Sequence, residues 1–107
     1  MLTYIDAIPA KSAISPGESL NVLGGVANHG EALETAISVW GNAGFGWVPL
    51  ITKTFLIAEG EHKHLYFTLT PEILREKLWG DEPEEFELII RAEEPEPQEN
   101  GVLIFVN

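Results

Sequence analysis

The stretch that decides the fold is Pro16-Gly-Glu-Ser-Leu-Asn-Val-Leu-Gly-Gly-Val-Ala-Asn28, which a His29-Gly30 turn separates from Ala36-Ile-Ser-Val-Trp40. Its Pro-Gly pair favours a turn, because proline presets φ and glycine permits positive φ. After that turn, side chains alternate with the period of two that is typical of a strand with one buried face. Asn28 and Gly30 both tolerate positive φ, so the chain is expected to reverse there. The pattern predicts two facing strands of a two-sheet β-sandwich.

Two adjacent glycines, Gly24 and Gly25, interrupt the first of these strands. Glycine weakens the interior of a strand and commonly marks a bulge or the close approach of another group. We therefore expect an aromatic ring to lie over the pair, with Trp40 packed against it. The side chains expected to face the core are those at the even positions: Leu20, Val22, Gly24 and Val26.

Further alternating segments follow along the chain, and prolines 9 and 49 indicate that two of them lie at sheet edges. Their number and spacing predict an all-β, immunoglobulin-like β-sandwich of about seven antiparallel strands, forming a single domain over residues 1–107. The segments expected to be strands are Leu2–Ile8, Leu20–Ala27, Thr35–Trp40, Val48–Ile51 with Lys53–Ala58, His62–Leu69, Phe86–Ala92 and Val102–Val106.

One segment predicts a helix instead. Thr70 is suited to the N-cap, Pro71 to the first helical position and Gly80 to the stop. We expect one short helix over about 71–79, between two late strands. Its apolar side chains would close one open end of the sandwich: Ile73, Leu74 and Leu78.

The net negative charge limits the classes of partner that are expected to bind the chain. The chain of 107 residues carries 17 acidic and 6 basic residues, for a net charge of -11, which disfavours nucleic acid and anionic membrane surfaces. There is no cysteine, which leaves the redox compartment open. No apolar segment approaches the roughly 20 residues of a spanning helix, and no signal-peptide pattern is present. The chain could still be one module of a longer secreted protein.

Five segments, taken in order, resemble a known family: Pro16-Gly-Glu-Ser-Leu20, Gly25-Val-Ala-Asn-His-Gly30, Thr35-Ala-Ile-Ser-Val-Trp40, Ile57-Ala-Glu-Gly-Glu61 and Glu93-Glu-Pro-Glu-Pro-Gln-Glu-Asn100. The chain resembles the CARDB family of bacterial and archaeal, adhesion-related immunoglobulin-like modules. It differs from the family in having a single Asn100 after the acidic tip and a more pronounced helix. The resemblance implies a non-catalytic spacer, adhesion or protein-interaction module of an extracellular or cell-envelope protein. It carries over no functional residues.

Two patterns in the sequence contain residue types that bind metals. His62 and His64 share one face of a strand, but a zinc or copper site needs further ligands and His29 lies in a distant turn. Nine acidic residues fall within 81–99, yet they are mostly glutamates interrupted by prolines, without the close Asp spacing of a calcium loop. Solvated histidines and solvated acidic turns are the favoured interpretations. We therefore expect no metal and no cofactor.

Aromatic residues suggest an alternative function. Sugar-binding β-sandwiches present flat rings to the C–H faces of pyranoses, with amides bonding the hydroxyls. Trp47, beside Asn42 in a glycine-rich loop, is the first candidate, with Trp40 and Tyr66 as further platforms. The competing interpretation is that these rings fill the core. A polysaccharide is therefore the alternative ligand.

Catalytic motifs are absent from the sequence: there is no Gly-x-Ser-x-Gly, no phosphate-binding loop and no cysteine nucleophile. We expect a protein that is not an enzyme. Its expected partners are another protein or neighbouring domains of a longer chain. An exposed edge strand, Leu2–Ile8 or Val48–Ile51, could pair with a partner or form a homodimer.

Overall fold

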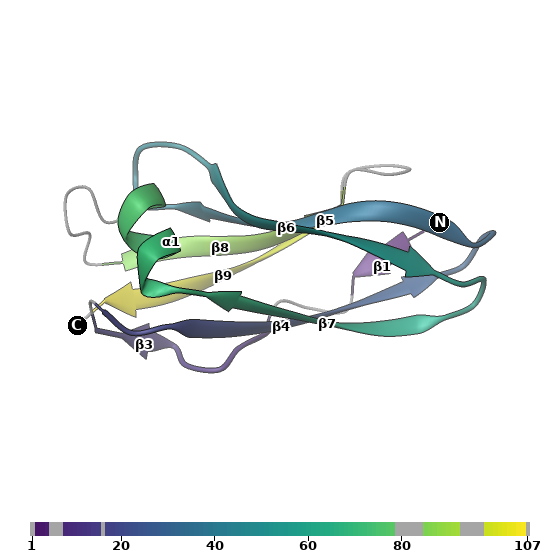
Figure 1. Cartoon of the computed structure of the whole chain (residues 1–107), viewed down its shortest axis with the longest axis horizontal. Helices are drawn as coiled ribbons and strands as arrows, with labels where there is room; N and C mark the ends of the chain where they lie inside the picture. Colours follow the sequence, from purple (N-terminus) through teal and green to yellow (C-terminus); the bar gives the residue numbers. More distant parts are fainter. Residues whose placement is uncertain (1, 5–7, 16, 79–84, 93–97, 107) are drawn as a thin grey trace.

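The computed structural model describes residues 2–4, 8–15, 17–78, 85–92 and 98–106. Two β-sheets pack face to face, and a short helix lies at one end of the elongated molecule, which measures 43 × 23 × 19 Å (Figure 1). The predicted all-β sandwich with one short helix is confirmed. Among the described residues no helix has the length and apolar character needed to cross a membrane.

The four-stranded sheet is built around β4 (Leu20–Asn28), the strand that follows Pro16-Gly17 in the sequence. One edge of β4 pairs with β7 (His62–Leu69), and the other pairs with β1 (Leu2–Tyr4) and β2 (Ile8–Pro9), all antiparallel. The predicted strand Leu2–Ile8 is thus seen as two short strands, and residues 5–7 lie outside the described part.

The glycine pair of β4 lies where the pairing partner on one side of β4 changes from β1 to β2. Tyr4 pairs with Val26, and Ile8 pairs with Leu23. The two β4 residues are three positions apart in the sequence, whereas their partners are four positions apart. Towards β7 the pairing continues without interruption through Gly24 and Gly25. The glycine pair therefore does not interrupt the pairing of β4 with β7.

The five-stranded sheet differs from prediction at both ends. A two-residue strand just before the predicted Pro16-Gly17 turn is not predicted from the sequence: its Ile14 is fully buried, and the strand pairs in parallel with the last strand. At the other end, the two predicted segments within 48–58 form one continuous edge strand. The strands follow the order β3 (Ala13–Ile14), β9 (Gln98–Val106), β8 (Glu85–Ala92), β5 (Leu33–Asn42) and β6 (Val48–Ile57).

The core lies between the sheets and is formed by alternate residues of each long strand. The even positions of β4 are buried, as predicted, and so are the predicted inward positions of β7 and β8. The fully buried side chains include Leu20, Val22, Val26, Ile37, Val39, Leu65, Phe67, Leu69, Phe86, Leu88 and Ile90.

Trp40 does not pack over the glycine pair. On β5 the fully buried residues are Ile37 and Val39, so the even position of Trp40 turns its ring to the outer face of the five-stranded sheet. There the half-buried indole ring lies 5.6 Å from the guanidinium carbon of Arg91. Gly24 and Gly25 belong to the other sheet, so the predicted contact is wrong.

Helix α1 (Pro71–Lys77) begins as predicted. The hydroxyl of Thr70 accepts a hydrogen bond from the Ile73 amide at 3.2 Å, and Pro71 occupies the first turn. Leu74 is fully buried, and the C-cap Leu78 is nearly so. The helix therefore anchors one end of the sandwich (Figure 1). Its predicted final residue, 79, and the stop at 80 lie outside the described residues.

Candidate functional site

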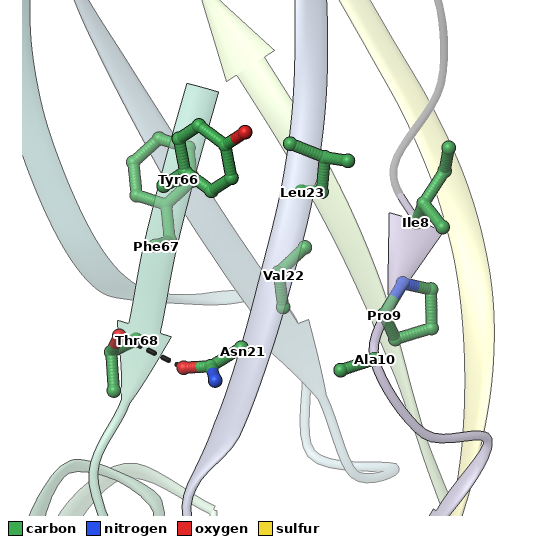
Figure 2. A pocket seen from close by; sticks show the side chains of 9 residues that line it. All are labelled: Ile8, Pro9, Ala10, Asn21, Val22, Leu23, Tyr66, Phe67 and Thr68. Carbon is green, nitrogen blue, oxygen red and sulfur yellow. Dashed lines mark hydrogen bonds between the residues drawn. The ribbon is translucent and has the colours of Figure 1, made fainter. Parts of the chain in front are cut away.

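A groove of about 470 Å³ crosses the outer side of the four-stranded sheet (Figure 2). Three segments from three strands line it: residues 8–10, 21–23 and 66–68. We call this feature the β4 groove, because β4 lies between the other two strands. Buried and outward-facing residues alternate along β4 and β7, which leaves Asn21, Leu23, Tyr66 and Thr68 facing outward.

Three apolar side chains form a row across the groove. Tyr66 pairs with Leu23 in one ladder, and Leu23 pairs with Ile8 in the next. Tyr66 is 68% exposed and Ile8 is 52% exposed, while Leu23 is half-buried. Figure 2 shows the three side chains on their three neighbouring strands. A contiguous apolar row of this kind is a candidate interaction surface, because large exposed apolar patches, unlike scattered side chains, mark such sites.

A polar pair lies beside this row. Thr68 Oγ1 donates a hydrogen bond to Asn21 Oδ1 at 2.9 Å, drawn as a dashed line in Figure 2. The Ala10 amide donates to the Asn21 carbonyl at 2.8 Å and continues the pairing of β2 with β4. The groove therefore combines an apolar row with a fixed amide and hydroxyl.

The charge on this face contrasts with that of the whole chain. The Lys53 ammonium group contacts two residues of β7: it donates to the Tyr66 carbonyl at 3.0 Å and lies 5.5 Å from the Phe67 ring centre. Despite 17 acidic residues in the chain, no carboxylate occurs among the described outward-facing positions of β2, β4 and β7. These positions are Ile8, Asn21, Leu23, Gly25, Ala27, His62, His64, Tyr66 and Thr68.

The two metal-site patterns have different outcomes. His62 and His64 are exposed on the outer side of β7, and within the described ranges no cluster of three histidine or carboxylate groups could hold a metal ion. Glu85 and Glu87 are exposed on β8. Six of the nine acidic residues within 81–99 lie outside the described residues, so calcium binding there stays untested.

The glycine-rich loop presents two aromatic rings. Phe45 is 82% exposed and Trp47 is 40% exposed. Asn42 Oδ1 accepts hydrogen bonds from the amides of Gly44 at 2.7 Å and Gly46 at 3.3 Å. Both glycines have positive φ, at 105° and 103°, which favours glycine over residues with a Cβ. Asn42 Oδ1 therefore stabilises the conformation of the loop. The Nδ2 group of Asn42 is the part of this side chain that is available to a ligand.

The structure keeps Asn42 and Trp47 at one loop but separates Tyr66 from Trp40 among the predicted sugar-binding residues. Trp40 and Tyr66 lie on the outer faces of different sheets, and Trp47 lies in the loop between β5 and β6. Trp40, Trp47 and Tyr66 each remain a candidate platform for a sugar ring. Sequence reasoning missed the other groove residues, although uncharged residues at the outward positions of strands in an acidic chain were a usable signal: Ile8, Asn21, Leu23 and Thr68.

No family model matches the sequence, and no curated protein matches it. Among solved structures, the CARDB domain of a Pyrococcus furiosus protein, in complex with di-metal ions, matches with a TM-score of 0.66. The match covers 99% of this chain and 92% of that domain at 15% identity. The chain has a CARDB-like fold. The sporulation control protein Spo0M of Bacillus subtilis also matches, with a TM-score of 0.66 and 18% identity over 99% of this chain and 49% of that one.

Larger proteins contain a similar fold. A β-glucosidase from Erythrobacter marinus matches all of this chain with a TM-score of 0.77 and 18% identity. A β-glucosidase from Listeria innocua, in complex with glucose, matches with a TM-score of 0.73 and 17% identity. The chain spans only 15% and 16% of the length of these two enzymes. The likeness is one of fold, because identity is below 20% in every case.

Proposed function

We propose that the chain is a non-catalytic immunoglobulin-like module that serves as a spacer, adhesion or protein-interaction domain of an extracellular or cell-envelope protein. One observation carries this proposal. The same fold accounts for 92% of a separately solved CARDB domain but only 15% of a β-glucosidase. A fold found both alone and as a small part of a larger chain suits a module that positions or contacts other domains.

An exposed sheet edge supplies the contact. β6 is the end strand of the five-stranded sheet, and no described strand pairs with its outer edge. Free N–H and C=O groups on such an edge can accept another strand. We propose that a neighbouring domain or partner protein pairs there; pairing with a second copy gives a homodimer.

An activity assay tests the non-catalytic role. The purified chain is incubated with chromogenic β-glucosides, and the Listeria innocua β-glucosidase serves as the positive control. We expect no turnover by the chain. Turnover that copurifies with the chain and is abolished by a single carboxylate substitution would overturn the proposal.

Sedimentation velocity tests the homodimer. Leu56 is 66% exposed on β6, and a lysine in its place opposes edge pairing through charge. A dimer that Leu56→Lys dissociates supports pairing at this edge. A chain that remains monomeric at all concentrations eliminates the homodimer and leaves pairing with a different domain.

The second candidate function is carbohydrate binding. It is favoured by the exposed rings of Trp47, Phe45 and Tyr66, because aromatic faces match the apolar faces of sugar rings. The fold likeness to β-glucosidases, one of them solved with laminaribiose, supports the same candidate. Calorimetric titration with a panel of soluble polysaccharides tests it, and an absence of binding across the panel would refute it.

A further inference from the structure

We propose that the β4 groove binds a neutral oligosaccharide, with Tyr66 as the stacking platform and Asn21 and Thr68 as partners for the hydroxyl groups. This inference rests on the second candidate function. It assigns binding to the face of the four-stranded sheet rather than to the loop of Trp47.

The apolar row supplies the platform. Tyr66, Leu23 and Ile8 lie opposite one another on three adjacent strands. Adjacent strands are about 4.8 Å apart, so the row extends roughly 10 Å across the sheet, enough for more than one sugar ring. The high exposure of Tyr66 and Ile8 leaves this row open to the C–H face of a ligand.

The polar pair supplies hydrogen bonds beside that platform. The bond from Thr68 to Asn21 Oδ1 fixes the side-chain amide. Within the described residues no hydrogen bond engages Asn21 Nδ2, so two N–H donors remain available. Thr68 Oγ1 retains acceptor capacity. A sugar hydroxyl both donates and accepts, which matches this pair.

Charge selects a neutral ligand. Among the described residues, no ionisable side chain other than the Tyr66 phenol lines the groove, and the outward positions around it include no carboxylate. A neutral ligand therefore desolvates no fully charged group on binding. A polyanionic ligand would be opposed by the net charge of -11.

Backbone pairing disfavours an extended peptide as the ligand. β4 is paired on both sides, with β7 and with β2, so its ladder groups at the groove are already used. Strand addition requires a free edge. The groove thus offers side chains, which suits a polyol better than a peptide backbone.

Amide chemical shifts of the whole chain test the proposal. Cellopentaose and laminaripentaose are titrated separately to about 10 mM, which detects dissociation constants in the millimolar range. We expect saturable shifts centred on Leu23, Tyr66 and Thr68. Tyr66→Ala and Asn21→Ala should each weaken binding at least about tenfold. His62→Ala, which removes an exposed side chain of β7 outside the groove lining, is the matched control and should bind normally.

Further variants separate the outcomes. Tyr66→Phe retains the ring and should retain binding, which keeps the test valid if Tyr66→Ala unfolds. Binding lost in Trp47→Ala but kept in Tyr66→Ala would overturn the groove assignment and leave carbohydrate binding intact. Saturation by neither oligosaccharide would overturn the groove proposal, while the polysaccharide panel decides the broader function. Shifts that follow protein concentration instead of sugar would assign this face to self-association and also overturn the proposal.

Discussion

The side chain of Asn28, at the end of β4, forms hydrogen bonds beyond the turn in which it lies. Its side chain is 1% exposed. Nδ2 donates to the carbonyl oxygens of Glu31 at 2.8 Å and of Ile57 and Ala58 at 3.2 Å, and Oδ1 accepts from the Gly30 amide at 3.0 Å. The predicted turn is present, but Gly30 is not among the glycines with positive φ. The side chain of Asn28 stabilises the turn and ties it to the end of β6.

Replacing Asn28 with alanine should therefore be costly. Asn28→Ala removes the side-chain donor to three carbonyl groups, including the buried bond to Ile57, and we expect the free energy of unfolding to fall by about 3 kcal/mol. Urea denaturation at constant m-value measures this. Asn21→Ala, at an exposed asparagine of the same strand, should change stability by only about 0.5 kcal/mol. Equal losses in the two variants would contradict the role of Asn28.

Glu18 lies in the turn before β4, where two contacts favour its ionised form. The Lys11 ammonium, 2.7 Å from Oε2, and the Ser15 amide, 2.7 Å from Oε1, lower the pKa of Glu18 from its ordinary value of 4.5. A lowered folded-state pKa gives stability that is present above the unfolded pKa and lost as pH falls through the folded one. The stabilisation is therefore lost on acidification below about pH 4.5.

A carboxyl titration by carbon-13 NMR checks this contact. Lys11→Met removes the ammonium, so the pKa of Glu18 should move up towards 4.5. Part of the lowering should persist, because the Ser15 amide still donates. An unchanged titration midpoint in Lys11→Met would show that the ion pair is absent in solution.

At the scale of elements, helix α1 and the bulged end of β5 are packed around one glycine. The β5–β6 register shifts between Val39 and Trp40. A Cβ on Gly41 would lie 3.0 Å from Leu50 Cδ1 and 3.1 Å from Leu78 Cδ1. Gly41 thus allows the end of the helix to pack closely on the sheet. The requirement is steric, because a positive φ is not found at this position.

Side-chain size at position 41 should set the stability of this packing. We expect Gly41→Ala to cost less than about 1 kcal/mol, because leucine methyl groups can move by a few tenths of an ångström, and Gly41→Val to cost about 1–3 kcal/mol. Guanidinium denaturation provides the measurement. Leu78→Ala should reduce the additional cost of Gly41→Val in a double-mutant cycle. Strict additivity would show that the two side chains do not compete for space.

At the scale of the whole molecule, negative charge is poorly compensated. The chain has 17 acidic and 6 basic residues. The described residues form ion pairs between Lys11 and Glu18 and, at 4.0 Å, between Lys63 and Glu61. Such an excess destabilises the compact state through repulsion. The described outward-facing positions of β2, β4 and β7, which include no carboxylate, are therefore a local exception.

Salt should stabilise the fold by screening this repulsion. Raising the salt concentration from about 10 mM to about 150 mM shortens the Debye length from about 30 Å to about 8 Å, and the melting temperature should rise. Differential scanning calorimetry with sodium chloride and with choline chloride measures the effect. Agreement between the two salts identifies screening, whereas a rise only with sodium would indicate specific ion binding. A fall in both salts would contradict net repulsion.

The sequence by itself determined the fold class and much of the core. Alternation placed Leu20, Val22 and Val26 on the buried face of β4, and Thr70 marked the start of the helix through its capping hydroxyl. These features depend on neighbours a few residues apart, so they can be predicted from local periodicity and capping chemistry.

Only the tertiary structure decided which faces and strands meet. Trp40 was expected over Gly24, but the two belong to different sheets. The β4 groove combines Ile8, Leu23 and Tyr66, which come from three strands distant in sequence. Local alternation tells which residues share a face of one strand. It does not tell which strands become neighbours, because that depends on long-range pairing and register across the whole chain.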